Sequence, residues 1–160
     1  MRSITGTNTL VAEATVRLAG PDDREALRGM YETFEPRPAS LGLPPQAKID
    51  EWLDRLAPAV NYLALVGEKL VGHAILCPEN GTGEVAVFVH QDYRGQGIGR
   101  LLLSALVEEG QRLGLRRAWG MTELDNVPML ALAHAVGFVP DSDPGMFHMD
   151  LRTEPSVRKS

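Results

Sequence analysis

The sequence predicts a single α/β domain built on a mixed, mostly antiparallel central sheet with helices on both faces. Three observations support this fold class. Short runs with strand-like patterns are interleaved with longer segments in which apolar residues recur at helical spacing. One run, residues 83–90, is apolar almost throughout, as expected for a strand covered on both faces. The 160 residues also suffice for one core, because a chain of this length buries about 70% of its unfolded surface.

The first part of the chain predicts one strand and two helices. Residues 14–19 alternate in polarity, as a strand does. Residues 21–34 predict a helix, because Pro21 and the acids after it suit a helix N-terminus. Residues 35–45 hold four of the eleven prolines and predict an irregular loop, long enough to act as a lid beside a substrate. Residues 46–56 predict the second helix, with one apolar face.

The remainder of the chain predicts a hairpin followed by alternating strands and helices. Residues 61–78 are two strand-like runs joined at "GEK". Residues 97–113 predict a helix in which Leu101, Leu102 and Leu106 face the core. The other expected elements are a helix at 126–137 and strands at 83–90, 115–122, 138–140 and 145–151.

The polar, aperiodic ends of the chain predict flexible tails at residues 1–12 and 152–160. Residues 13–151 between them are expected to form the single domain. The sequence leaves the oligomeric state open, and a homodimer is one of the alternatives.

The composition argues against nucleic-acid and membrane partners. Lys and Arg number 16 against 21 Asp and Glu, and the positive charges are scattered rather than gathered in a stripe. No stretch approaches the ~20 apolar residues of a membrane span, and no signal-like apolar block stands near the start. The single cysteine, Cys77, fits a reducing compartment and is expected to be a small buried apolar side chain. We therefore expect a cytoplasmic protein.

Three glycines stand where the 83–90 strand meets the next helix, in "HQDYRGQGIGR". Such a junction presents free backbone N–H groups at the positive end of a helix, and Gly95, Gly97 and Gly99 let an anion approach them closely. Arg94 and Arg100 add positive charge, so we expect a bound phosphate or pyrophosphate; the alternative is a glycine-rich turn without a ligand. The spacing excludes both a Walker A loop and the G-x-G-x-x-G dinucleotide fingerprint.

The stretch "VFVHQDYRGQGIGRLLL" resembles the acetyl-CoA-binding motif of the GCN5-related N-acetyltransferase (GNAT) family. The resemblance continues through "TELDNVPMLALAHAVGF" and covers roughly residues 14–151. It implies the acyl-CoA N-acyltransferase fold and an acetyl-CoA-dependent N-acetyltransferase, nearest the bacterial Pat-type protein lysine acetyltransferase domains.

The resemblance also implies which residues hold acetyl-CoA. Phe88 and Val89 would pair with the pantetheine amides, and a backbone N–H near them would meet the oxyanion of the reaction. Asn126 would contact the cofactor arm. The pyrophosphate would be held by Arg94, Gly95, Gln96, Gly97, Ile98, Gly99 and Arg100.

Transfer to an amine requires a proton acceptor. A lysine-type amine has a pKa near 10.4, so keeping it neutral at pH 7 costs about 4 to 5 kcal/mol. Glu84, the one carboxylate in "GEVAVFVH", is the expected general base, with Glu123 as the second candidate; the alternative for Glu84 is a solvated residue at a strand end. Ala133 stands where the family often has a tyrosine acid, so no general acid is assigned.

The resemblance leaves the acceptor open between a protein lysine and a small-molecule amine, and a non-catalytic acyl-CoA sensor is a further alternative. Glu35, Glu51 and Asp54 could recognise a cationic acceptor, or could simply be solvated. The histidines lack metal-ligand spacing, so no metal is expected.

Overall fold

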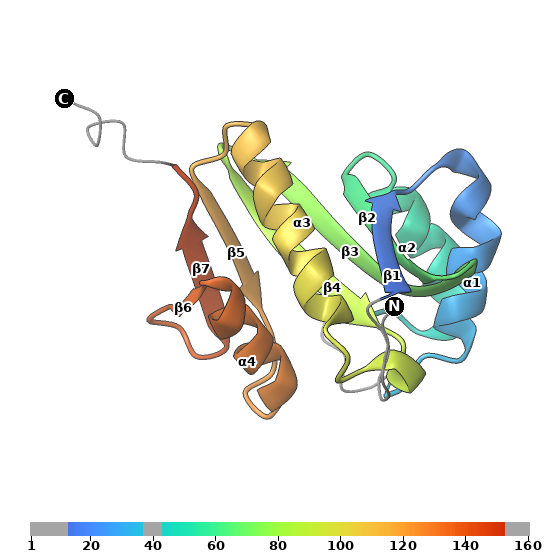
Figure 1. Cartoon of the computed structure of the whole chain (residues 1–160). Coiled ribbons are helices and arrows are strands. Elements are labelled where there is room, and N and C mark those ends of the chain that lie inside the picture. Colours follow the sequence, from blue (N-terminus) through green and yellow to red (C-terminus); the bar gives the residue numbers. More distant parts are fainter. Residues whose placement is uncertain (1–12, 37–42, 153–160) are drawn as a thin grey trace.

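The computed structural model describes residues 13–36 and 43–152, which form a seven-stranded sheet flanked by helices (Figure 1). The strands are β1 (Ala14–Leu18), β2 (Val60–Val66), β3 (Lys69–Glu79), β4 (Thr82–Val89), β5 (Arg117–Met121), β6 (Val139–Pro140) and β7 (Met146–Asp150). The helices are α1 (Arg24–Glu32), α2 (Ile49–Leu56), α3 (Ile98–Arg112) and α4 (Val127–Val136), with short 3-10 turns η2 (Pro21–Asp23), η3 (Gln46–Lys48) and η4 (Gln91–Tyr93). The strand order is β1-β2-β3-β4-β5-β7-β6.

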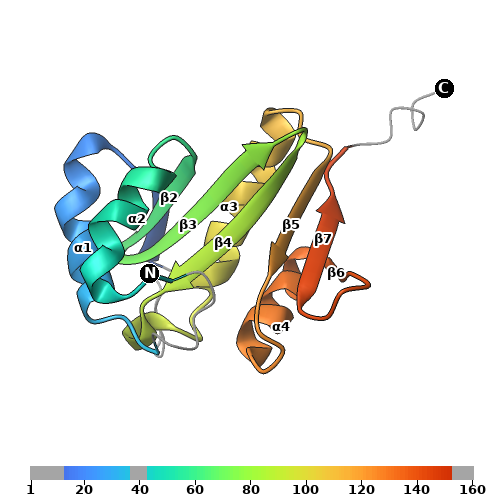
Figure 2. The ribbon, with the colours of Figure 1, turned by 180° about the vertical axis from the view of Figure 1, so that it is seen from behind.

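Helices cover both faces of the sheet. One core cluster joins the sheet to α3 and α4, and a second cluster joins it to α1 and α2 (Figures 1 and 2). Side chains of β4 alternate between the two clusters: Val85 belongs to the first and Phe88 to the second. The predicted fold class is therefore confirmed.

β4 and β5 form the one parallel pair among the described strands, and they pair over a very short length. Thr82, Gly83 and Glu84 of β4 lie opposite residues 117–119 of β5, and no pairing continues beyond Glu84. The two strands diverge from that point (Figure 2). The edge of β4 that faces β5 is consequently open from Val85 onward.

A buried polar network links α1 to β2 and β3. The Tyr31 hydroxyl lies 2.7 Å from His73 Nδ1, and His73 Nε2 lies 2.8 Å from Asn61 Oδ1. Because Oδ1 can only accept, Nε2 carries the proton and Nδ1 accepts from Tyr31. Asn61 also donates to the carbonyls of Leu56, the last residue of α2, and Ala59, which lies between α2 and β2. Complete burial lowers the pKa of His73 to about 3, so the imidazole is neutral.

The predicted elements differ from the observed ones mainly at their ends. The first two predicted helices begin with the turns η2 and η3 rather than with α-helix. Leu101 is 47% exposed, not buried as expected, because the buried face of α3 passes through Leu102, Leu103 and Leu106. Of the predicted lid, residues 37–42 lie outside the described residues, as does the predicted tail 1–12. None of the helices in the described ranges is long and apolar enough to cross a bilayer.

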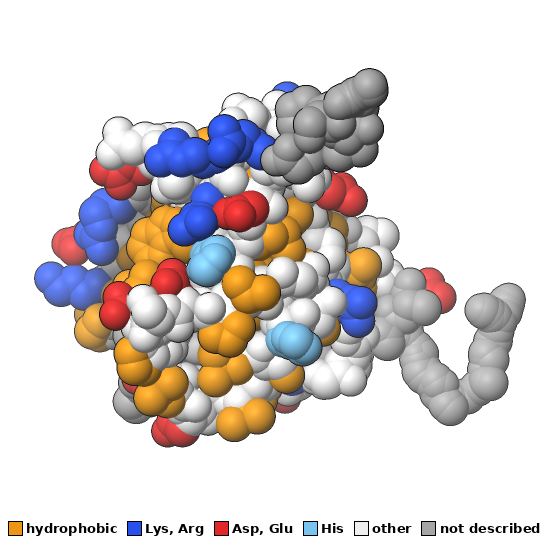
Figure 3. Space-filling view, turned by 90° about the vertical axis from the view of Figure 1, so that its left-hand side faces the viewer, with side chains coloured by type: hydrophobic (Ala, Val, Ile, Leu, Met, Phe, Trp, Pro, Cys, Tyr) orange, Lys and Arg blue, Asp and Glu red, His pale blue; other side chains and the backbone are white. Residues whose placement is uncertain are grey.

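The side of the molecule that carries β6, β7 and α4 has a mixed surface. Figure 3 shows apolar side chains exposed there among basic and acidic ones. Exposed large apolar residues in the chain from the end of β5 to β6 are Met121, Leu124, Val127 and Val139.

The His73 network predicts a pH-dependent stability. An unfolded histidine binds a proton near pH 6.5, whereas His73 in the folded state does so only near pH 3. The unfolded state thus binds more protons in this window, so the free energy of unfolding falls as the pH drops from 6.5 toward 3. His73→Gln lacks this titration and should show a shallower decline between pH 7 and pH 5 in urea denaturation. An equal slope in both proteins would contradict the assignment.

Candidate active site

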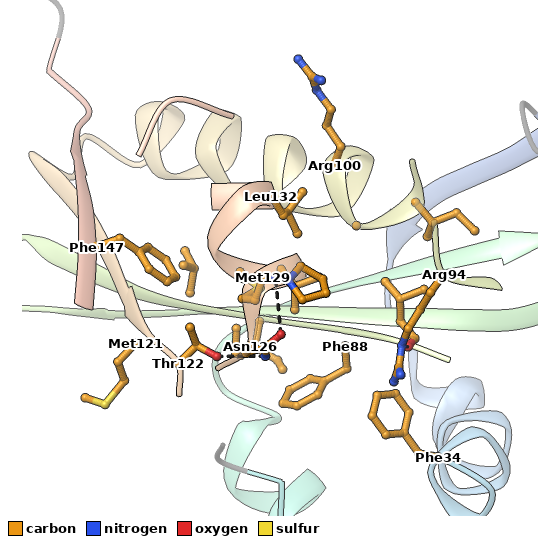
Figure 4. Close-up of a pocket in the computed structure, with 18 of the residues that line it drawn as sticks. Phe34, Phe88, Arg94, Arg100, Met121, Thr122, Asn126, Met129, Leu132 and Phe147 are labelled. Carbon is orange, nitrogen blue, oxygen red and sulfur yellow. Dashed lines mark hydrogen bonds between the residues drawn. The ribbon is translucent and has the colours of Figure 1, made fainter. Parts of the chain in front are cut away.

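A cavity of about 870 Å³ lies where β4 and β5 diverge. Its wall combines β4 from Glu84 onward and the following loop, the start of α3, the β5–α4 loop with the first part of α4, and Phe147 of β7. Side chains from β3, from α2 and from the segment after α1 complete it. Figure 4 shows side chains from both sides of the sheet converging on it. The cavity therefore reaches both faces of the sheet through the gap between the two strands.

The glycine-rich loop forms the end of the cavity at the N-terminus of α3. Gly95 and Gly97 have φ angles of 76° and 88°, a left-handed conformation that side chains disfavour, and a Cβ at either would meet nothing within 4 Å. Within residues 13–36 and 43–152, the backbone N–H groups of residues 95–100 have no hydrogen-bond acceptor. These N–H groups stand at the positive end of the fifteen-residue helix α3 and suit an anion.

Gly99 differs from the two glycines before it. It lies in the first turn of α3, and a Cβ there would come within 3.0 Å of Leu132 Cδ2 on α4. Its small size therefore allows α3 and α4 to pack closely. The sequence alone does not distinguish Gly99, which is needed for its small size, from Gly95 and Gly97, which are needed for their backbone conformation.

The two arginines that flank the loop point in different directions (Figure 4). Arg94 turns into the cavity, where Nε donates to the Val89 carbonyl at 2.7 Å and the guanidinium lies 5.0 Å from the Phe34 ring centre. Burial lowers the pKa of Arg94 from its ordinary value, but arginine remains charged. Arg100 points away from the strands. Arg94 thus brings positive charge to the side of the cavity next to α1.

The open edge of β4 offers backbone groups to the cavity that no neighbouring strand pairs, although the Val89 carbonyl already accepts from Arg94 Nε. His90 N–H donates to the Val71 carbonyl of β3, and the β3–β4 register is regular. Successive residues of a strand point their backbone N–H and C=O groups to opposite sides. The backbone groups of Phe88, two residues before His90, therefore also face β3, whereas those of Val87 and Val89 face the gap. Phe88 contributes its ring to the cavity instead. Val87 is an edge residue that the sequence did not single out, because its position depends on the register.

Glu84 lies at the closed end of the gap and lines the cavity. Its side chain shares the sheet face of Phe88, the face covered by α1 and α2. Burial raises the pKa of Glu84 above its ordinary value. Cys77, directly opposite on β3, is half-buried rather than buried as expected, and it lines the cavity too. Glu123 is not among the residues that line the cavity.

Asn126 lines the cavity and caps α4. Its Oδ1 accepts from the Met129 N–H at 3.3 Å, and its Nδ2 donates to the Thr122 hydroxyl at 3.0 Å (Figure 4). This pair fixes the start of α4 beside β5. Ala133, about two turns further along, is buried and does not line the cavity. The cofactor contact of Asn126 stays a prediction, as do the roles of the other site residues.

The end of α1 is fastened to the loop after β4. The Thr33 hydroxyl lies 2.8 Å from His90 Nε2. The Gln91 amide donates to the Thr33 carbonyl at 2.6 Å and accepts from the Glu35 N–H at 3.0 Å. The segment after α1, which contributes Phe34 and Pro36 to the cavity, is therefore held against the loop that leads to the glycines.

The acids expected to recognise a cationic acceptor lie outside the cavity. Asp54 pairs with Arg24 at 2.7 Å, and Glu51 lies 3.8 Å from Lys48, all on the outer surface of α1, η3 and α2. Glu35 contributes its backbone to the Gln91 contact but does not line the cavity. Among the described residues, no three His, Cys, Asp or Glu side chains gather as metal ligands would.

Comparison with known proteins gives a consistent picture. The model of the acetyltransferase (GNAT) family matches residues 25–138. The L-methionine sulfoximine/L-methionine sulfone acetyltransferase of Salmonella typhimurium is 28% identical over 145 residues, covering 78% of this chain and 79% of that protein. The L-amino acid N-acyltransferase MnaT of Escherichia coli is 40% identical over 109 residues, covering 55% of this chain and 63% of that protein.

A solved structure shares the fold. The structure of yncA from Salmonella typhimurium, determined with its cofactor acetyl-CoA, matches with a TM-score of 0.67 at 20% identity. The match covers 92% of this chain and 99% of that chain. The free loop amides, the open edge of β4 and the inward Arg94 are features that suit a diphosphate with an amide-bearing arm.

The loop geometry predicts that Gly97→Val lowers coenzyme A affinity at least tenfold, measured by calorimetry. The side chain would strain a left-handed residue and stand where the anion approaches. Gly114→Val is the matched control: Gly114 has a φ of 79° and open surroundings, but follows the other end of α3. It should lose comparable stability and keep its affinity. Equal affinities in both variants would overturn the anion site.

Proposed function

Because the chain belongs to the acetyltransferase (GNAT) family of acetyl-CoA-dependent N-acetyltransferases, we propose that it acetylates a primary amine by direct attack in a ternary complex. In this reaction the amine nitrogen attacks the thioester carbonyl, a C–N bond forms and the C–S bond breaks. Glu84 receives the amine proton, and coenzyme A leaves as its thiolate. One observation carries the proposal: the open edge of β4, the free loop amides and Glu84 all border one cavity.

The amine is proposed to belong to a small molecule. Two curated relatives are named for acetyl or acyl transfer to amino acids or methionine derivatives. The acids that could attract a basic protein segment lie outside the cavity and pair with Arg24 and Lys48. A protein lysine is the alternative acceptor, and acetylation of a lysine peptide in the same assay would support it.

The strand geometry supports a proton relay through water. Glu84 and Phe88 share one face of β4, and four residues of strand span about 13 Å. An amine that attacks beside Val87 and Val89 therefore lies beyond direct reach of the Glu84 carboxylate, and a chain of ordered waters would join them. The raised pKa of Glu84 makes it a stronger base than an exposed glutamate.

The backbone of β4 is proposed to stabilise the negative charge that develops on the thioester oxygen. The N–H groups of Val87 and Val89 face the gap and are fixed by the regular pairing of β4 with β3. Fixed amide donors stabilise such charge without reorganising. A thiolate is a tolerable leaving group, because a thiol has a pKa of only about 8.5. The mechanism therefore does not depend on a tyrosine at the position of Ala133.

Glu84→Gln is expected to leave acetyl-CoA affinity within a few-fold and to lower kcat at least tenfold at neutral pH. The raised pKa also predicts that wild-type activity falls as the pH drops through it, because the protonated carboxyl is no base. This acidic limb should disappear in the variant. Thiol release measured against pH, with calorimetry for acetyl-CoA, checks both expectations.

Two further variants sharpen the result. Glu79→Gln, at the exposed end of β3, is a matched control and should keep full activity. Glu123→Gln tests the second candidate. If Glu123→Gln rather than Glu84→Gln removes the acidic limb, the assignment of the base is wrong.

A further inference from the structure

The side of the cavity next to α1 and α2 has an apolar wall. Six side chains form it: Phe34, Trp52, Leu56, Ile75, Cys77 and Phe88, here called the acceptor wall. Ile75 and Cys77 of β3 stand beside Ala86 and Glu84 of β4 on the same sheet face, so the wall runs from Glu84 to the ring of Phe88. The Glu84 carboxylate therefore stands at one end of an apolar surface.

The acceptor wall is bordered by one negative and one positive charge. Glu84 lies at one end, and the Arg94 guanidinium lies over Phe34 at the other. The remaining charged residues that line the cavity, Arg100 and Asp125, belong to α3 and to the loop before α4. Among the described residues, the wall thus offers no second carboxylate to a second cation.

The acids of α2 are engaged elsewhere. Asp50 lies 3.2 Å from Arg28 and 3.5 Å from Arg24, and Asp54 lies 2.7 Å from Arg24. These ion pairs fasten α1 to α2 on the surface that faces away from the wall. They leave the inner face of α2 to Trp52 and Leu56.

The acceptor wall is preformed and stiff. The Phe88 ring lies edge-on to Trp52 and Phe34, with centroids 5.6 Å and 6.0 Å apart. Tyr31 packs against all three rings and is itself fixed by its hydrogen bond to buried His73. A ligand that buries apolar surface here spends little free energy on ordering the protein.

We propose that the acceptor is a primary monoamine with an aromatic or aliphatic body, and that a second cationic group excludes a molecule from the acceptor wall. The inference rests on the proposed function, since it takes the amine to attack beside β4 and to pass its proton to Glu84 through water. An apolar body is stabilised by the rings, whereas a second ammonium would lie against apolar surface or near Arg94. Polyamines, aminoglycosides and lysine in a basic peptide are therefore poor acceptors.

Hexylamine and 1,6-diaminohexane make a matched pair of probes, because they share a chain length and differ by one ammonium group. With saturating acetyl-CoA, kcat/KM for hexylamine should exceed that for the diamine at least tenfold. Between butylamine and hexylamine, kcat/KM should rise about fourfold for each methylene that reaches the wall. Equal or better use of the diamine overturns the proposal. This comparison uses the wild-type protein and depends on no variant.

Leu56→Glu places a carboxylate on the acceptor wall and should lower the preference for hexylamine over the diamine at least fivefold. Leu18→Glu is the control: Leu18 is an apolar residue of β1, 56% exposed and outside the cavity, and its variant should keep the wild-type preference. Acetyl-CoA affinity should stay unchanged in both, and thermal unfolding checks that each folds. If Leu56→Glu folds and keeps the wild-type preference for hexylamine over the diamine, the acceptor wall does not bind the amine and the proposal is wrong.

Calorimetric titration of both amines into the protein saturated with coenzyme A separates this inference from the proposed function. If neither amine is acetylated but hexylamine binds more tightly than the diamine, the proposed function fails and the acceptor class stands. If both are acetylated and the diamine is preferred, the acceptor class is wrong and the proposed function stands.

Discussion

The short pairing between β4 and β5 is the constraint on which the site depends. Three residues of β4, Thr82–Glu84, hold the two strands together, and from there the strands separate. An unpaired strand edge inside a fold is costly, because its N–H and C=O groups need partners. Here that edge borders a cavity of about 870 Å³, where an extended, amide-bearing ligand can supply those partners. The gap also brings Glu84, at its closed end, to the same space as the loop amides.

The ends of the gap are kept apart by separate sets of contacts. α4 starts beside β5, because Asn126 caps the helix and binds Thr122. The loop after β4 is fastened to α1 through His90 and Gln91. Close packing of α3 on α4 at Gly99 then sets the distance between these two groups of elements. The separation of β4 and β5 is thus produced by the packing of the protein itself and does not require a bound ligand.

Local patterns in the sequence predicted most of the fold. The helices α3 and α4 and the strands β3 to β5 lie within a few residues of their predicted bounds, because apolar periodicity and terminal glycines define them. The turn between β3 and β4 is an Asn-Gly pair, Asn80 and Gly81, both with positive φ, and this pair is a local hairpin signal in the sequence. Features that depend on strand register could not be predicted: the open backbone of Val87 and the place of Cys77 on the acceptor wall. The ion pairs that engage Asp50 and Asp54 could not be predicted either, because they depend on how α1 and α2 pack together. Of the site residues chosen from the glycine-rich motif, all except Gln96 border the cavity, and Glu123 does not border it either.

The alternation of residue directions along a strand explains how β4 can contact two substrates at once. Its odd-numbered residues, Val87 and Val89, direct backbone groups into the gap and side chains toward α3 and α4. Its even-numbered residues, Glu84 and Phe88, direct backbone groups to β3 and side chains toward α1 and α2. One strand can therefore bind a thioester arm along its edge while it presents a base and an apolar wall to the amine. A shift of the β3–β4 register by one residue would exchange these roles and turn the Glu84 side chain away from the amine. The arrangement of the site therefore depends on this one register.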